Sequence, residues 1–570
     1  MKYSKRYIIF TTFLILFLGF YFIQTRVDGG TVERFRGGSM QQSVWNPMVA
    51  AEVNRQAIKV TIDNKEYAGS QYGFYMDENR NVMAPVTMLR DALNCSAFIY
   101  DDRELLVEKH NLWARFSLNA KTALTSEGEE LDVSSGLVEK DGEFFISLND
   151  LSDLLSYNWS FDYGENGMIT ADTSESTSVV PASYDLRTRE RVSKIRDQGS
   201  YLTCWAFAAT SAVESSLLPS QKELFSVDHM TMSNSFDTDQ YDGGEDTMGM
   251  AYLAAWQGPV YEKDDPYGDG ISDDTLEPVA HVQQMRIIDA KDFDGIKTAV
   301  FKYGGVQTSL YNTLHSSSPY SEYYNSETSA YCYIGKEKPN HDVLIIGWDD
   351  NYSKDNFQSE VEGDGAFICQ NSWGEEFGED GVFYVSYYDT NIGTHNIVYT
   401  GIEGTDNYDH IYQSDLCGWI GKIGYEKESI YGANVFEAES DETIEAASFY
   451  ATGANTEFEL YVVKNFDGKD SLQKRTKVAA GVVERAGYYT IPLEKKMEVD
   501  RGEKYAIVLY IKTPGATHPL AIEYDTGEES LRSIDLEDGE GYISSKGTKF
   551  DNVKEKQDCN LCIKAFTKNR

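Results

Sequence analysis

The chain has 570 residues, and its 51 lysines and arginines against 92 aspartates and glutamates give a formal net charge of −41. This length suffices for roughly three to four domains, and a surface this negative repels phosphate backbones, which excludes a nucleic-acid-binding protein. Hydrophobic residues make up 41% of the chain and aromatic residues 13%, too much core material for a disordered acidic protein. The composition therefore predicts a globular protein with several domains.

Residues 1–26 contain one apolar segment of membrane length. Lys2, Lys5 and Arg6 precede an uncharged, mostly apolar run from Tyr7 to Ile23. As a helix this run would span about 25 Å, the short end of what a bilayer requires, and the basic flank predicts a cytoplasmic N-terminus. The run ends in bulky residues, whereas a signal-peptide cleavage site needs small ones. We therefore expect a retained anchor with the bulk of the chain outside the cell, and a cleaved signal of a secreted protein is the alternative.

Residues 27–57 are predicted to be a linker, and residues 58–172 a small duplicated α+β module. Each copy of the repeat reads as a strand, a short helix and a pair of strands. The apolar positions Met83, Leu89, Leu93, Leu106 and Val107 return 62 positions later as Phe145, Leu151, Leu155, Met168 and Ile169. The module resembles the copper amine oxidase N-terminal-like domain of bacterial surface proteins, without copper ligands, and a stalk or spacer role is favoured. A Ser/Thr-rich linker follows at 173–180.

Cys204 is predicted to begin a helix that ends at Pro219. The residues after it that keep helical spacing are Trp205, Ala208, Ala209, Ala212, Val213, Ser216 and Leu217. At a helix N-terminus the unpaired N–H groups and the positive end of the dipole favour the thiolate, which is the nucleophilic form of cysteine. A buried structural cysteine is the alternative at this point.

Two later segments carry the partners that a nucleophilic cysteine needs. His341 stands at the start of a buried strand predicted over 343–347, and a second strand predicted over 366–370 leads into Asn371. A cysteine nucleophile requires a base that takes its proton, and that base requires a third group that orients its ring. Trp373 is placed to shield the bond between Asn371 and His341 from water.

Four ordered motifs identify residues 181–403 as resembling a papain-family cysteine peptidase, which implies that family's α+β fold. The motifs are Gln198-Gly199, Cys204-Trp205-Ala206-Phe207, Asn340-His341 and Asn371-Ser372-Trp373-Gly374. The resemblance implies that Cys204 is the nucleophile, His341 the acid and base, and Asn371 the orienting residue. It also implies an oxyanion hole made by the Gln198 side chain and the Cys204 N–H. Trp205 and Trp373 are expected to be structural neighbours of the site, and no metal or cofactor is expected.

The sequence departs from that family in two places. Family members usually have a disulfide near the nucleophile, but Tyr201 and Tyr241 occupy the positions of its two cysteines. The following Gly243 and Gly244 are predicted to let a substrate backbone approach closely, although a glycine pair is equally typical of a turn. The family's helical propeptide is also missing, and the duplicated module stands in its place.

Residues 404–570 are predicted to form an all-β sandwich. Six short alternating segments occur there, and Phe458, Leu460 and Val462 show the two-residue period of a half-buried strand. The region resembles the lectin-like domain that follows the peptidase in some bacterial and archaeal relatives. The aromatic residues Tyr408, Tyr412 and Trp419 suit either a sugar platform or a domain interface, and the interface is favoured.

Together these patterns predict a multidomain cell-surface cysteine peptidase that acts on peptides or proteins, with carbohydrate as a candidate partner of its last domain. Two alternatives remain open at this point. One is a surface adhesion or glycan-binding protein with a vestigial peptidase domain. The other is a thiol amidase or transpeptidase that acts on cell-wall peptides.

Overall fold

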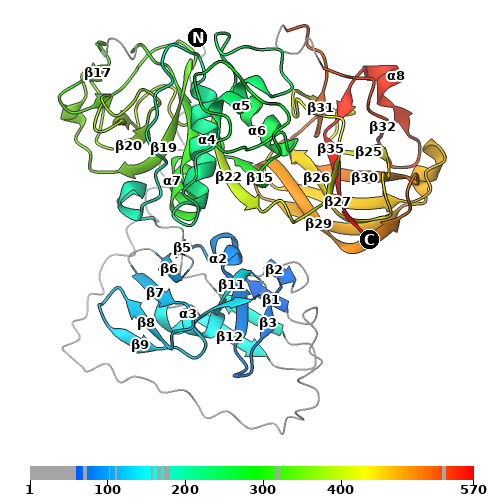
Figure 1. The fold of residues 1–570 in the computed structure, drawn as a ribbon, viewed down its shortest axis with the longest axis horizontal. Coiled ribbons are helices and arrows are strands. Elements are labelled where there is room, and N and C mark those ends of the chain that lie inside the picture. The colour runs from blue at the N-terminus through cyan, green and yellow to red at the C-terminus, as the bar shows by residue number, and fades with distance from the viewer. Residues whose placement is uncertain are drawn as a thin grey trace, which may run out of the picture. The chain divides into compact units, whose positions relative to one another are not determined.

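The computed structural model describes residues 59–63, 65–68, 73–101, 103–109, 112–140, 142–155, 158–162, 168–172, 180–314, 320–528 and 534–570 (Figure 1). Within these ranges no helix combines the length and the apolar character that crossing a bilayer requires. The segment from Tyr7 to Ile23, predicted to be a membrane anchor, lies outside the described residues, as do the linkers 27–57 and 173–179. The predictions made for those segments stay predictions.

The described residues of the N-terminal module form short strands and two short helices. Its elements are β1 (Lys59–Ile62), β2 (Lys65–Ala68), β3 (Tyr75–Met76), β4 (Val82–Pro85), α2 (Val86–Ala92), β5 (Ser96–Tyr100), β6 (Glu104–Lys109), β7 (Leu112–Ser117), β8 (Thr122–Thr125), β9 (Glu130–Asp132), β10 (Leu137–Lys140), β11 (Glu143–Ser147), α3 (Leu148–Leu155), β12 (Asn158–Asp162) and β13 (Met168–Asp172). Strand β4, helix α2 and strands β5 and β6 correspond to β11, α3, β12 and β13. The two copies are joined where β4 pairs with β11, and β1, which precedes the first copy, pairs in parallel with β13.

The middle region combines a helical part with a mostly antiparallel sheet. Its elements are β14 (Ser183–Asp185), η2 (Leu186–Arg189), α4 (Cys204–Leu217), α5 (Val227–Met232), α6 (Asp246–Ala254), β15 (His281–Ile287), α7 (Phe293–Lys302), β16 (Val306–Leu310), β17 (Tyr324–Asn325), β18 (Ala330–Tyr331), β19 (His341–Asp349), η3 (Lys354–Asn356), β20 (Ala366–Gln370), β21 (Val382–Ser386) and β22 (Asn396–Glu403). Helix α4 packs against α5, α6 and strands β16, β19 and β22, and Figure 1 shows it beside β19. This packing brings the start of α4 to the sheet that carries His341.

Helix α4 is buried on all sides, whereas its apolar spacing predicts only one buried face. Every residue from Trp205 to Ser216 is buried. The polar side chains inside are satisfied: Glu214 pairs with Arg196 at 3.2 Å, and Ser215 Oγ donates to the backbone oxygen of Arg191 at 2.7 Å. Small alanine and serine side chains allow this close packing, and the helix ends before Pro219, which lacks an N–H.

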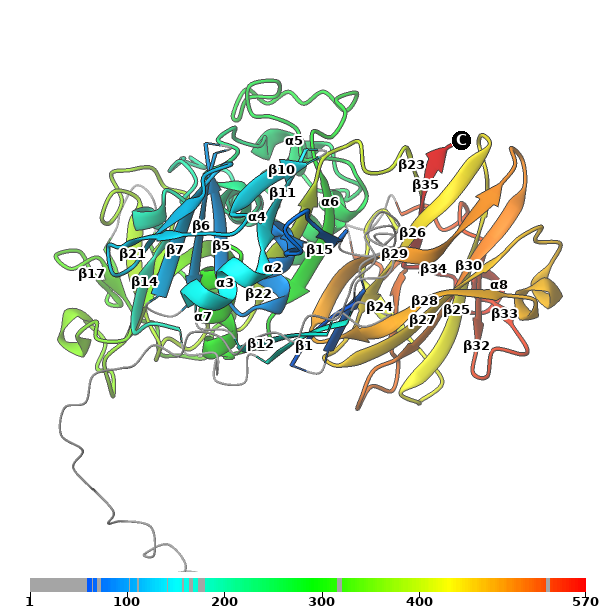
Figure 2. The same cartoon turned by 90° about the horizontal axis from the view of Figure 1, so that it is seen from below.

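The C-terminal region is the all-β sandwich that the alternating pattern predicts. Its elements are β23 (His410–Tyr412), β24 (Gly421–Ile423), β25 (Ser429–Glu437), β26 (Glu442–Ala451), β27 (Thr456–Val463), η4 (Lys469–Gln473), β28 (Thr476–Val483), β29 (Ala486–Val499), β30 (Lys504–Lys512), β31 (Leu520–Glu523), β32 (Gly541–Ser544), β33 (Asp551–Asn552), α8 (Val553–Gln557), β34 (Asn560–Leu561) and β35 (Ile563–Asn569). One sheet has the order β28-β27-β30-β25-β32-β33, and β26, β29, β31 and β35 belong to the other (Figure 2). Phe458, Leu460 and Val462 are buried in the core of the sandwich, as their spacing predicts.

The second sheet of the sandwich continues into the middle region, which the sequence did not predict. Strand β15 pairs with β22 on one side and with β29 on the other, so that Met285 lies opposite Tyr399 and Tyr488. The pairing gives a single sheet of 16 strands. The boundary predicted near residue 403 therefore separates two folds that share backbone hydrogen bonds.

Candidate active site

Cys204 is the first residue of α4, as its sequence context predicts. The loop before it turns at Gly199, whose φ is +63°, and the Gly199 N–H donates to Asp197 Oδ1 at 2.8 Å. The Leu202 N–H donates to the backbone oxygen of Gln240 at 2.8 Å, which ties the loop to the segment before Gly243. The Cys204 side chain is half-buried at the N-terminal end of the helix.

The His341 and Asn371 side chains are in contact. His341 Nε2 lies 2.8 Å from Asn371 Oδ1, and both residues are buried. Strands β19 and β20 are paired, with Leu344 opposite Gln370, so the start of one strand lies beside the end of the other. Because the amide oxygen accepts only, Nε2 carries the proton and Nδ1 keeps the lone pair that a general base needs. The Trp373 ring lies 5.0 Å from the His341 ring, as expected of a residue that shields this bond.

Both polar atoms of the Gln198 side-chain amide form hydrogen bonds. Its Oε1 accepts a hydrogen bond from Ser372 Oγ at 2.6 Å, and its Nε2 donates to the Tyr201 backbone oxygen at 2.7 Å. The Gln198 N–H also donates to the Ser372 backbone oxygen at 2.8 Å. An amide nitrogen has two hydrogens, so one remains for a developing oxyanion. Ser372 thus orients the amide, a role that the sequence analysis did not assign to it.

Backbone conformation and packing explain why positions 243 and 244 are glycines. Gly243 has a φ of +82°, which favours glycine, and a Cβ on Gly244 would lie 2.4 Å from Trp205 Nε1. The indole of Trp205 is buried directly beneath this backbone. The structure therefore explains the glycine pair by packing, and contact with substrate at these residues stays a prediction.

Burial opposes the effect that the helix start was expected to have on Cys204. Burial raises the pKa of the Cys204 thiol to about 12, and the Asp342 carboxylate adds to the rise. The N–H groups of Asp342, Trp205 and Cys204 lower this pKa, but by less. Burial also lowers the pKa of His341 to about 4, against the opposing effect of its bond to Asn371. Desolvation thus opposes the helix terminus at Cys204 and favours the neutral imidazole at His341.

Asp342 is a neighbour of the nucleophile that the motifs did not reveal. Its carboxylate accepts from Ser309 Oγ at 2.6 Å and from Gln307 Nε2 at 3.0 Å. Burial raises the pKa of Asp342 to about 6, and Asp246 at the start of α6 adds to the rise. A buried carboxylate near a nucleophilic thiol disfavours the thiolate unless a cation or a proton neutralises the carboxylate.

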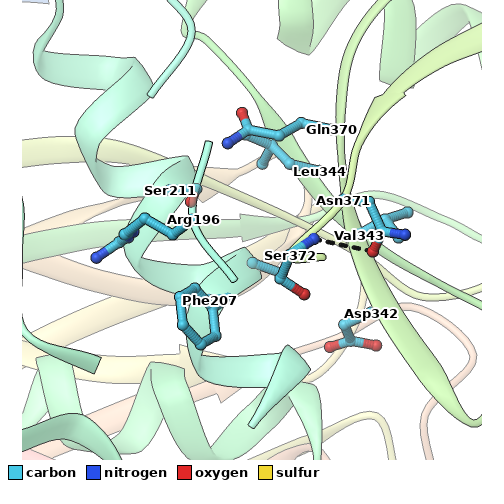
Figure 3. A pocket seen from close by; sticks show the side chains of 10 residues that line it. Arg196, Phe207, Ser211, Asp342, Val343, Leu344, Gln370, Asn371 and Ser372 are labelled. Atoms are coloured by element: carbon cyan, nitrogen blue, oxygen red, sulfur yellow. Dashed lines mark hydrogen bonds between the residues drawn. The ribbon is translucent and has the colours of Figure 1, made fainter. Parts of the chain in front are cut away.

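Asp342 also lines a small cavity of about 10 Å³ behind the site (Figure 3). The cavity lies between α4, which contributes Phe207 and Ser211, and the segments that carry Asp342, Asn371 and Ser372. The dashed bond in Figure 3 joins the Ser372 N–H to Asn371 Oδ1 at 2.9 Å. Asn371 Oδ1 therefore accepts two hydrogen bonds, which fix the orientation of the amide toward His341.

The three aromatic residues at the start of the last region do not form one platform. The Tyr408 ring packs on Phe566 at 5.3 Å, and the Trp419 ring packs on Tyr450 at 6.2 Å. The Tyr412 hydroxyl instead donates to Glu442 within the sandwich, at 2.8 Å. Among the described residues, no group of three or more His, Cys, Asp or Glu side chains is arranged to hold a metal ion.

Comparisons with known proteins match the two larger regions. The model of the papain family cysteine proteases matches residues 180–402, and the model of a lectin-like domain matches residues 411–567. Procathepsin L of Felis catus is 28% identical over 210 residues, 35% of this chain and 59% of that protein. Pro-cathepsin H of Mus musculus is 25% identical over 259 residues, 43% of this chain and 74% of that protein. The match thus spans about three fifths of procathepsin L.

Two solved structures cover both regions together. A clostridial cysteine protease, Cwp84, after propeptide cleavage, is 29% identical with a TM-score of 0.61, over 68% of this chain and 99% of that one. The cysteine protease and lectin-like domains of Cwp84, a surface layer associated protein of Clostridium difficile, are 27% identical with a TM-score of 0.59, over 68% and 89% of the two chains. This chain therefore contains a papain-family cysteine-type peptidase domain followed by a lectin-like domain. The resemblance of residues 58–172 to a copper amine oxidase N-terminal-like domain stays a prediction.

Proposed function

We propose that this protein hydrolyses peptide bonds by two-step acyl transfer at Cys204. The observation that carries the proposal is the 2.8 Å bond between Asn371 and His341, which begins a strand, β19, that packs against α4. It orients a neutral imidazole whose Nδ1 is free of the proton and can serve as the base. Four family motifs are intact in the same domain, which supports an active enzyme over a vestigial one.

The reaction begins when His341 takes the thiol proton as Cys204 Sγ attacks the peptide carbonyl. The carbonyl oxygen becomes an oxyanion that the Cys204 N–H and the second amide hydrogen of Gln198 stabilise. The imidazolium then gives its proton to the leaving amine, and an acyl-enzyme remains. Water, deprotonated by His341, attacks this thioester and releases the acid together with the free thiol.

Labelling with an epoxysuccinyl probe tests the nucleophile. The probe should modify Cys204 in the full-length protein and no other cysteine, since the remaining thiols are buried. Cys204→Ala should abolish both labelling and peptide hydrolysis with the melting temperature unchanged. His341→Ala should lose several orders of magnitude in turnover and Asn371→Ala less, because Asn371 orients the base and does not move the proton. Peptide hydrolysis that survives Cys204→Ala would overturn the assignment.

A burst experiment with an activated ester separates this proposal from its two alternatives. A peptidase should release a burst of product equal to the enzyme concentration and should also cleave peptide libraries. An adhesion protein with a vestigial domain should give no burst. A cell-wall amidase or transpeptidase should give a burst but should turn over wall peptides in preference to protein substrates.

We further propose that the protein acts at the cell surface. The proposal is supported by the predicted anchor from Tyr7 to Ile23 and by the likeness to a surface layer associated protein. Full-length protein should stay with membranes through a high-salt wash, and external protease should reach the peptidase domain. Mature protein that begins near Val27 and is found free in the medium would favour secretion.

A further inference from the structure

The loop 198–203 links the two groups assigned to the oxyanion hole. The Gln198 side chain lies at its start, and the Cys204 N–H follows its end. The loop has no regular secondary structure, and the disulfide that usually fixes it in the family is replaced by Tyr201 and Tyr241. The separation of the two donors therefore depends on what else holds the ends of this loop.

The Tyr267 hydroxyl is bonded to both ends of the loop. It donates to the Gln198 backbone oxygen at 2.9 Å, and it lies 2.7 Å from Thr203 Oγ1. A tyrosine hydroxyl has one hydrogen, which goes to the Gln198 carbonyl, so the Thr203 hydroxyl is the donor in the second bond. The phenol oxygen thus bridges the residue that carries the oxyanion-hole amide and the residue that precedes Cys204.

The ring of Tyr267 is fixed from two sides. It packs edge-on against Phe207 of α4 with centroids 4.7 Å apart, and against Tyr201 at 6.1 Å. Tyr201 in turn contacts Tyr241 at 5.0 Å. The two tyrosines that replace the cysteines are therefore in contact with each other, and one of them joins the loop to the Tyr267 ring. Tyr241 is 62% exposed, so its contact with Tyr201 alone constrains the loop less than a disulfide would.

We propose that Tyr267 is a positioning residue that sets the geometry of the oxyanion hole through its hydroxyl, in place of the missing disulfide. The inference rests on the proposed peptidase function. Loss of the hydroxyl should let Gln198 and Cys204 move apart while the thiol and His341 stay in place. Since displacement of a catalytic group by about 1 Å can lower a rate by up to two orders of magnitude, a decrease of about tenfold in kcat is expected.

The experiment compares Tyr267→Phe with two further variants in the full-length protein. Tyr267→Phe keeps the ring and removes the hydroxyl, and Thr203→Val removes the second bond without changing the shape of the side chain. Tyr510→Phe is the matched control, because Tyr510 lies on β30 of the sandwich, where its ring contacts Tyr431. All three are measured for kcat and KM on an amide substrate, and for melting temperature.

Two inhibitors distinguish a positioning role from general damage. A peptide aldehyde adds the Cys204 thiol across its carbonyl, and the resulting hemithioacetal oxygen occupies the oxyanion hole. Iodoacetamide alkylates the same sulfur, with loss of iodide, and does not need the hole. Tyr267→Phe should weaken aldehyde inhibition about tenfold and lower kcat by the same factor, with KM and the alkylation rate within twofold of wild type. Thr203→Val should act in the same direction and Tyr510→Phe should have no effect.

Unchanged aldehyde affinity and kcat in Tyr267→Phe would overturn the inference. So would equal losses in aldehyde affinity and alkylation rate, which indicate structural damage. The same measurements separate this inference from the proposed function. If wild-type protein neither hydrolyses peptides nor reacts with the aldehyde, the peptidase proposal itself fails; if it does both and Tyr267→Phe matches it, only the positioning role fails.

Discussion

Replacing Asp342 by asparagine should lower the pKa of the Cys204 thiol and make it react faster near neutral pH. Burial raises the thiol pKa, and the charge of the Asp342 carboxylate raises it further. Its own pKa is raised to about 6, so above pH 6 it carries a negative charge beside the nucleophile. Asparagine keeps the shape of the side chain and the backbone N–H but removes that charge. The charge opposes formation of a second anion, which fixes the direction of the effect.

The size of the effect follows from the interaction of two like charges that lie near each other. Such a neighbour shifts a pKa by roughly one to three units. For each unit that the thiol pKa falls, the thiolate fraction at a fixed pH below it increases about tenfold, while the intrinsic nucleophilicity decreases with a Brønsted coefficient of about 0.4–0.5. The net gain in alkylation rate is therefore about threefold per unit. We expect an increase of roughly three- to thirtyfold at pH 8.

The same substitution should change the dependence of stability on pH. The pKa of Asp342 is raised from 3.8 to about 6 in the folded protein, so this group stabilises the fold below about pH 4 and loses that contribution as the pH rises through 6. Two units correspond to about 3 kcal/mol. Relative to wild type, Asp342→Asn should therefore gain stability between pH 4 and pH 7 by an amount of that order.

Alkylation by iodoacetamide between pH 5 and pH 9, followed by mass spectrometry at Cys204, measures the first effect. Asp355→Asn is the control, because Asp355 is exposed and its loss changes the net charge of the protein equally. If Asp342→Asn and wild type show the same rate profile, the carboxylate does not act on the thiol and the electrostatic argument is wrong. If Asp355→Asn shifts the rate profile equally, the effect comes from the net charge of the protein.

Three further predictions concern the rest of the chain. Lys564→Met should destabilise the protein by about 3–5 kcal/mol in thermal unfolding, because it leaves the Asp415 carboxylate buried without its partner. Lys564 is 1% exposed and pairs at 2.8 Å with Asp415, which is fully buried. A loss below about 1 kcal/mol would contradict this prediction. Mass mapping without reductant should find no bridge among the three buried thiols Cys332, Cys369 and Cys417, and any such bridge would contradict the structure. Deletion of residues 404–570 should lower the melting temperature or give insoluble protein, whereas unchanged stability and turnover, with glycan retention by the isolated sandwich, would favour a detachable lectin.

The sequence predicted those parts of the site that lie within local patterns. Helical spacing placed Cys204 at the start of α4, and two apolar runs placed His341 and Asn371 at the ends of strands β19 and β20. Each of these predictions needs only a short run of neighbouring residues. The contact between the strands then follows from their pairing, and the pairing brings the side chains to hydrogen-bonding distance.

The charge state of the site could not be predicted in this way. The helix terminus that favours a thiolate is a local feature, but the desolvation that opposes it comes from the whole domain. Asp342 is a further case: its partners Ser309 and Gln307 lie on β16, more than thirty residues away. Tyr267 likewise reaches Gln198 across 69 positions. Such groups have no spacing that marks them, because their role depends on tertiary packing.

The continuous sheet predicts that the last region stabilises the peptidase domain, whether or not it binds sugar. Strand β15 lies between β22 and β29, so removing the sandwich would expose the N–H and C=O groups along residues 284–287. An exposed edge of this kind invites pairing with other chains. The buried aromatic rings of Tyr450 and Tyr488, which belong to the peptidase core cluster, would be lost with it. Strand β22 also pairs with β16, and Ser309 on β16 donates a hydrogen bond to the Asp342 carboxylate. Disorder at the exposed edge of β15 would therefore lie two strands from β16, which holds Asp342.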